Sequence, residues 1–72
     1  MEYVFVVVAD FDSLTEVIGV SQDMKAAKSL AQRDAGDDVS LEWRESVPDN
    51  FYAKSSRPIG KQLGILKRPL WP

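Results

Sequence analysis

The sequence predicts an α+β domain in which a ββαβ unit forms a three-stranded sheet with one helix on one face. Three observations lead to this prediction. Residues 2–9 are β-branched and aromatic, residues 22–35 carry apolar side chains at helical spacing, and residues 39–44 alternate between apolar and polar. With 72 residues and a hydrophobic fraction of 44%, the chain has the size and composition of one small globular domain.

Residues 2–9 are predicted to form the central strand, because the side chains on both of its faces are apolar. One face carries Val4, Val6 and Val8, and the other carries Tyr3, Phe5, Val7 and Ala9. Residues 10–14 supply turn-forming side chains, and residues 15–20 follow as a second strand. The short connection predicts that these two strands form a hairpin.

A helix is predicted over about residues 22–35. Ser21 is the expected N-cap, Asp23 lies in the first turn, and Gly36 follows as a left-handed terminator. The apolar positions that recur at helical spacing are Met24, Ala27, Leu30 and Ala31.

Val39, Leu41 and Trp43 predict a half-buried third strand, which ends before Pro48. A right-handed crossover would place this strand beside the first one, so the expected sheet order is 2-1-3. A single helix covers only one face of such a sheet. We expect the other face, with Tyr3, Phe5 and Val7, to be covered by the C-terminal segment, by a second copy of the chain or by a partner.

Charge divides the chain into an acidic ββαβ body at residues 1–48 and a basic tail at residues 49–72. All eleven acidic residues lie within residues 1–50, whereas residues 51–72 carry five of the nine basic residues and no acid. Two explanations stay open. Either the tail folds back and neutralises the body, or the two parts face different partners.

The tail also combines aromatic and basic residues, and this combination is typical of segments that bind other macromolecules. Ile59, Leu63, Leu66 and Leu70 recur at spacings that fit an amphipathic helix, which could either close the open sheet face or dock on a partner. The predicted partner-binding residues are Phe51, Tyr52, Lys67, Arg68, Leu70 and Trp71.

Several features of residues 3–45 resemble small bacterial and phage proteins of uncharacterised activity. These proteins share a V-x-V-V strand, a second strand that closes on G-V-x-S, an alanine-containing helix and a strand bearing E-W. The matching residues are Val4, Val6, Val7, Gly19, Val20, Ser21, Ala27, Ala31, Glu42 and Trp43. This chain lacks the aromatic residue between valine and serine. The resemblance implies a compact ββαβ unit and no particular activity.

The composition argues against an enzyme, a metal protein and a cofactor-dependent protein. The chain has no histidine and no cysteine, the commonest general base and metal ligands. Asp10-Phe11-Asp12 resembles the D-x-D opening of haloacid-dehalogenase-type phosphatases, but that fold needs a much longer chain. We interpret these acids as turn residues. Asp34, Asp37 and Asp38 fit no series of calcium ligands, so no metal is expected.

We therefore expect a non-enzymatic protein-binding module, an accessory or inhibitory protein of phage or bacterial type, which docks on a larger host or cognate protein. A homodimer is a further expectation. The alternative function is a small nucleic-acid-binding regulator that uses the basic tail. The seven-residue apolar run at residues 3–9 is too short for a membrane helix and lacks the basic leader of a signal peptide, so no membrane contact and a cytoplasmic location are expected.

The sequence predicts that the Trp71 side chain contributes strongly to binding a partner. Pro69 and Pro72 stiffen the backbone around it and lower the entropy lost on docking. We expect Trp71→Ala to remove partner binding while leaving the thermal melting curve unchanged. If Trp71 is instead buried in the core, the same substitution will cost about 3–5 kcal/mol and the melting temperature will fall sharply.

Overall fold

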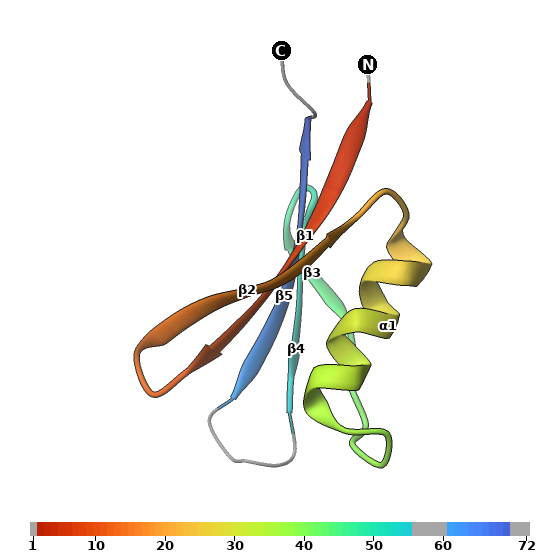
Figure 1. Cartoon of the computed structure of the whole chain (residues 1–72). Coiled ribbons are helices and arrows are strands. Elements are labelled where there is room, and N and C mark those ends of the chain that lie inside the picture. Colours follow the sequence, from red (N-terminus) through yellow and green to blue (C-terminus); the bar gives the residue numbers. More distant parts are fainter. Residues whose placement is uncertain (1, 56–60, 70–72) are drawn as a thin grey trace.

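The computed structural model describes residues 2–55 and 61–69, which form a five-stranded antiparallel sheet with one helix across one face (Figure 1). The strand order is β2-β1-β5-β4-β3. The elements are β1 (Tyr3–Phe11), β2 (Leu14–Ser21), α1 (Met24–Ala35), β3 (Arg44–Val47), β4 (Asn50–Lys54) and β5 (Gln62–Pro69). The predicted α+β class with one helix is confirmed.

The N-terminal hairpin is confirmed as well. β1 pairs with β2 from Phe5–Ser21 to Phe11–Leu14, and its other edge pairs with β5. β1 is therefore an interior strand, as its two apolar faces predict. Ile18 is an extra residue on β2, because the register shifts between Val7–Gly19 and Val8–Val17.

The predicted three-stranded sheet of order 2-1-3 is wrong. The position beside β1 belongs to β5, which pairs with it from Tyr3–Pro69 to Asp10–Gln62. β4 follows on the far side of β5, and β3 lies at the outer edge of the sheet. Two strands thus come from residues 49–72, the segment predicted as a tail. β5 alternates as a strand does, with Leu63 and Ile65 buried on one face, although its leucines also fit helical spacing.

The segment predicted as the third strand runs extended but pairs with no strand until Arg44. Val39 is buried, and Leu41 and Trp43 pack against the core from the helix side of the sheet. The predicted burial of one face of this segment is confirmed, since Ser40, Glu42 and Arg44 are exposed. Burial does not require a hydrogen-bonded neighbour, however, and this segment diverges from β4 instead of pairing with it.

The core lies between α1 and one face of the sheet. It consists of Val7, Ala27, Ala31, Leu63 and Ile65, all fully buried. The two alanines let the helix approach closely, and Leu30 of the helix lies over Gly19, whose missing side chain leaves room for it. Lys61 also ties the helix end to the start of β5, through a 2.7 Å ion pair with Asp34.

Both helix ends are capped. Asp23, not the predicted Ser21, is the N-cap, and its Oδ1 accepts a 2.7 Å hydrogen bond from the Ala26 amide. Ser21 supports this cap, since its hydroxyl accepts a hydrogen bond from the Asp23 amide. Gly36 ends the helix as predicted, with φ of 114° and its amide donating to the Gln32 carbonyl.

The two candidate caps make different contributions to stability. Asp23→Ala should lower the free energy of unfolding by about 1 kcal/mol, because it leaves the Ala26 amide without its partner. Ser21→Ala should cost less, since Ser21 bonds only to the backbone of Asp23. Urea denaturation of both variants measures the difference. A larger loss for Ser21→Ala would contradict the assignment of the cap.

Candidate functional site: the helix-free face of the sheet

In the part of the chain that the structure describes, no helix lies over the sheet face opposite α1, and we call it the helix-free face (Figure 1). The registers of the paired strands determine which side chains project from this face. Val7, Ile65 and Phe51 share one row and pack against the helix side, so the alternate rows project from the opposite face.

Three rows of paired residues cross the helix-free face. Each row runs from the β2 edge through β1 and β5 towards β4. The first row is Val20, Val6, Leu66 and Asn50; the second is Val17, Val8, Gly64, Tyr52 and Arg44; the third is Thr15, Asp10, Gln62 and Lys54. Val47 of β3 extends the first row beyond Asn50. In the first two rows the β2–β1–β5 side is apolar and the β4–β3 side, apart from Val47, is polar, whereas the third row is polar throughout.

We call Val4, Val6, Val8, Val17, Val20 and Leu66 the apolar strip. Val17 and Val20 are 61% and 57% exposed, although they lie on a strand beside other apolar side chains. Isolated exposed valines are ordinary on a protein surface, but a continuous row of them marks an interaction surface. The strip is therefore the first component of the candidate site.

Gly64 joins the apolar and polar sides of the face. A Cβ atom at this position would lie 3.0 Å from Val8 Cγ2 and 3.1 Å from Tyr52 Cε1. The Tyr52 ring therefore lies across β5 in the space that a side chain at Gly64 would fill. This contact helps to bury Val8, which is only 7% exposed without any helix above it.

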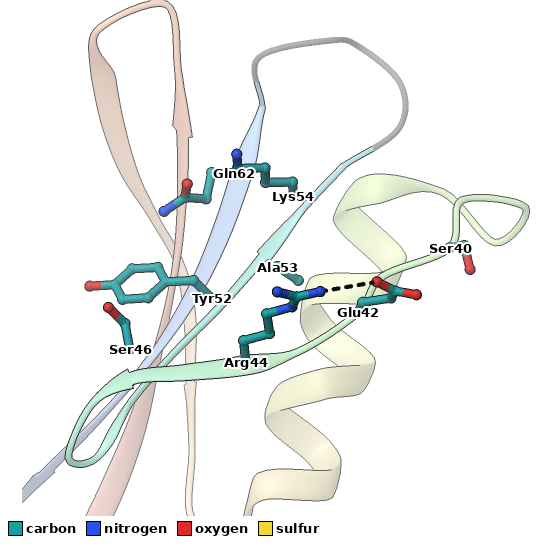
Figure 2. Close-up of a pocket in the computed structure, with 8 residues that line it drawn as sticks. All are labelled: Ser40, Glu42, Arg44, Ser46, Tyr52, Ala53, Lys54 and Gln62. Atoms are coloured by element: carbon teal, nitrogen blue, oxygen red, sulfur yellow. Dashed lines mark ion pairs between the residues drawn. The ribbon is translucent and has the colours of Figure 1, made fainter.

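A hollow of about 770 Å³ lies at the polar side of the face, and we call it the groove (Figure 2). It opens where the segment before β3 diverges from β4. Figure 2 shows Tyr52, Lys54 and Gln62 on one side of it and Glu42 and Arg44 on the other. The lining residues are Ser40, Glu42, Arg44, Ser46, Tyr52, Ala53, Lys54 and Gln62.

The helix-free face carries more positive than negative charge, although the whole chain is at −2. The basic side chains are Arg44, Lys54 and Arg68, and the acidic ones are Asp10 and Glu42. Asp10 accepts a hydrogen bond from the Thr15 hydroxyl. Arg44, Lys54 and Arg68 therefore give this face three cations in an acidic protein.

The predicted partner-binding residues lie at different places. Tyr52 lines the groove, whereas Phe51 packs against the core on the helix side. The Lys67 amine lies 4.5 Å from the centre of the Tyr3 ring, and Arg68 donates a 2.9 Å hydrogen bond to Asn50 Oδ1. Leu70 and Trp71 lie outside the described residues.

Tyr3, Phe5 and Val7, predicted for the uncovered face, lie on the helix side of the alternation. Val7 is fully buried and Phe5 packs against the core, while Tyr3 is exposed beyond it. The opposite set, Val4, Val6 and Val8, projects from the helix-free face. Sequence reasoning missed Arg44, Lys54 and Gln62 as neighbours, because only the non-local pairing of β3, β4 and β5 brings them together.

The described residues contain no group of three or more acidic side chains that could hold a metal ion. In the same ranges, no helix is long and apolar enough to span a membrane. What the helix-free face offers is an apolar strip, hydrogen-bonding groups and cations.

Comparison of the chain with protein-family models, with curated proteins and with solved structures finds no match in any of the three.

The stacked arrangement of Val8, Gly64 and Tyr52 can be tested by a double-mutant cycle. Gly64→Ala should lower the free energy of unfolding by about 1–3 kcal/mol, because the added methyl group overpacks the contact between Val8 and the Tyr52 ring. In a Tyr52→Ala background the same substitution should cost much less. Thermal and urea denaturation of the wild type, the two single variants and the double variant measure the free energies of unfolding. If the losses of the two single variants simply add in the double variant, the contact between residue 64 and the Tyr52 ring is contradicted.

Proposed function

We propose that this protein is a non-enzymatic protein-binding module that docks on a larger protein through its helix-free face. The observation that carries the proposal is the apolar strip, in which Val17 and Val20 are more than half exposed beside Val6 and Leu66. A strip of this kind gains free energy when a partner removes it from water.

The charges around the strip define the chemistry of the partner. Arg68 lies at one end of the face, and Arg44 and Lys54 lie at the groove. An apolar centre with a charged border is the usual anatomy of a protein interface. The complementary surface on the partner is therefore an apolar patch bordered by carboxylates.

The C-terminal residues belong to the same proposal. β5 ends at Pro69, directly before Leu70 and Trp71 in the sequence, and Arg68 projects from the helix-free face beside Val4. Tryptophan and arginine are among the residue types that most often dominate binding energy, so we propose that Arg68 and, two residues after Pro69 in the sequence, Trp71 contribute to docking.

A nucleic-acid-binding regulator is the second candidate, favoured by the three cations of the face. Sheets that bind single-stranded nucleic acid stack two or three bases on aromatic side chains. Within the described residues, Tyr52 is the one aromatic side chain in the rows that cross the helix-free face. This supports a protein partner over a nucleic acid.

The proposal is tested by capture from a lysate of cells that express the protein, with two matched variants. Val17→Ser with Val20→Ser removes the exposed part of the strip, and Phe11→Ser with Leu14→Ser changes two exposed apolar residues at the β1–β2 turn. We expect the same protein to be captured by the wild type and the turn variant, and at least about tenfold less of it by the strip variant, because burying two valines contributes more than 1.4 kcal/mol.

Three outcomes contradict the proposal. Equal capture by both variants would place binding elsewhere on the molecule. Capture that disappears after nuclease treatment would favour the nucleic-acid regulator. A mass of twice 8.1 kDa in light scattering, lost in the strip variant, would make a second copy of this chain the occupant of the face.

A further inference from the structure

We infer that the groove between β4 and the segment before β3 binds an extended, acidic segment of the partner, which adds to the sheet beside Lys54. The inference rests on the proposed protein-binding function, and it specifies which part of the partner enters and by which contacts. Three features of the groove support it: an open strand edge, two cations on its lining and hydrogen-bonding side chains beside them.

The open strand edge follows from the hydrogen-bond alternation along β4. The Ser55 amide donates to the Lys61 carbonyl, and the Lys67 amide donates to the Asp49 carbonyl, so the odd-numbered residues of this stretch bond to β5. The peptide groups of Lys54 and Tyr52 therefore point towards β3. Tyr52 pairs there with Arg44, and the ladder ends at that pair.

Lys54 is consequently the one residue of β4 that directs its backbone N–H and C=O into the groove without a paired strand among the described residues. The chain that could have paired with it is drawn away, because Val39, Leu41 and Trp43 pack against the core. A strand edge left open in this way is the structural requirement for strand addition by an extended peptide.

The side chains beside this edge select an acidic segment. Arg44 and Lys54 line the groove together, and the nearest acid, Glu42, lies 4.0 Å from the Arg44 guanidinium. Both members of that pair are more than four-fifths exposed, so their mutual attraction is weak and a ligand carboxylate can replace it. A carboxylate placed between two cations makes charge-assisted hydrogen bonds.

Polar side chains complete the lining. Ser40, Ser46 and Gln62 offer hydroxyl and amide groups, and the Tyr52 ring forms an apolar wall (Figure 2). A strand added beside Lys54 directs alternate side chains to opposite faces of the sheet. A segment that alternates acidic and apolar residues can therefore place its carboxylates on the face that carries Arg44 and Lys54, and its apolar side chains on the opposite face, where Ala53 lines the groove. The unpaired edge of β4 ends at the Arg44–Tyr52 pair, so the segment that can add to it is short.

The test uses a fluorescein-labelled peptide of sequence Glu-Val-Glu-Val-Glu-Val, titrated with the full-length protein and followed by fluorescence anisotropy at low salt. The comparison ligands are the Lys-Val peptide of the same length, the Glu-Val peptide with alternate backbone nitrogens methylated, and a hexathymidylate. The groove variant is Arg44→Gln with Lys54→Gln. Its matched control is Lys25→Gln with Lys28→Gln, which removes the same charge from the exposed face of the helix.

We expect the Glu-Val peptide to bind and the Lys-Val peptide not to bind. The groove variant should weaken binding about tenfold or more, and the helix variant less than about twofold. Methylation of the peptide backbone should weaken binding to a similar extent, because it removes N–H donors of the added strand. Failure of the Glu-Val peptide to bind, or equal loss in both variants, overturns the inference, and tighter binding of hexathymidylate identifies a nucleic-acid site instead.

This experiment is separable from the test of the proposed function. If the groove variant still captures the partner fully while the strip variant does not, the acidic-segment inference fails and the protein-binding function stands. If the groove variant and the strip variant each reduce capture whereas the helix variant does not, the acidic-segment inference and the protein-binding function are both supported.

Discussion

The pairing of β1 with β5 is the interaction on which the rest of the structure depends. It joins residues near the two ends of the described chain, from Tyr3–Pro69 to Asp10–Gln62, and it occupies the centre of the sheet. β4 adds to β5 and β3 adds to β4, so three strands are attached to β1 only through this pairing. Such non-local contacts require loop closure before they gain any free energy, which makes the sheet a single cooperative unit.

The second constraint is that one helix cannot cover five strands. α1 contacts β2, β1 and β5, and the extended segment at residues 39–43 covers the remaining part of the same face with Leu41 and Trp43. Using that segment as a cover prevents it from extending β3, and the groove results. The apolar strip has the same origin, because no further element among residues 2–55 and 61–69 covers the opposite face. Both parts of the candidate site are therefore consequences of how a short chain closes its core.

Local signals predicted the parts of the fold that depend on local chemistry. The apolar strand at β1, the helical spacing of Ala27 and Ala31 and the terminator Gly36 were all read correctly. The partner of β1 could not be predicted in this way, because pairing is decided by the whole chain. Leu63 and Leu66 fit both a helix and a strand, and Val4, Val6 and Val8 look as suitable for the core as Phe5 and Val7. The groove was not predictable either, since Arg44 and Lys54 become neighbours only through the β3–β4 pairing.

The fold also distributes the basic residues of the C-terminal part of the chain between two surfaces. Of the basic residues after position 50, Lys61 forms an ion pair with Asp34 and neutralises part of the helix end, whereas Lys54 and Arg68 join Arg44 on the helix-free face. Exposed charges act over about 8–10 Å at moderate salt, so they govern the rate of encounter. Burial of an apolar surface is insensitive to that screening, and in the proposed function it governs the lifetime of the complex. Under that proposal the cations attract an acidic partner and the apolar strip retains it.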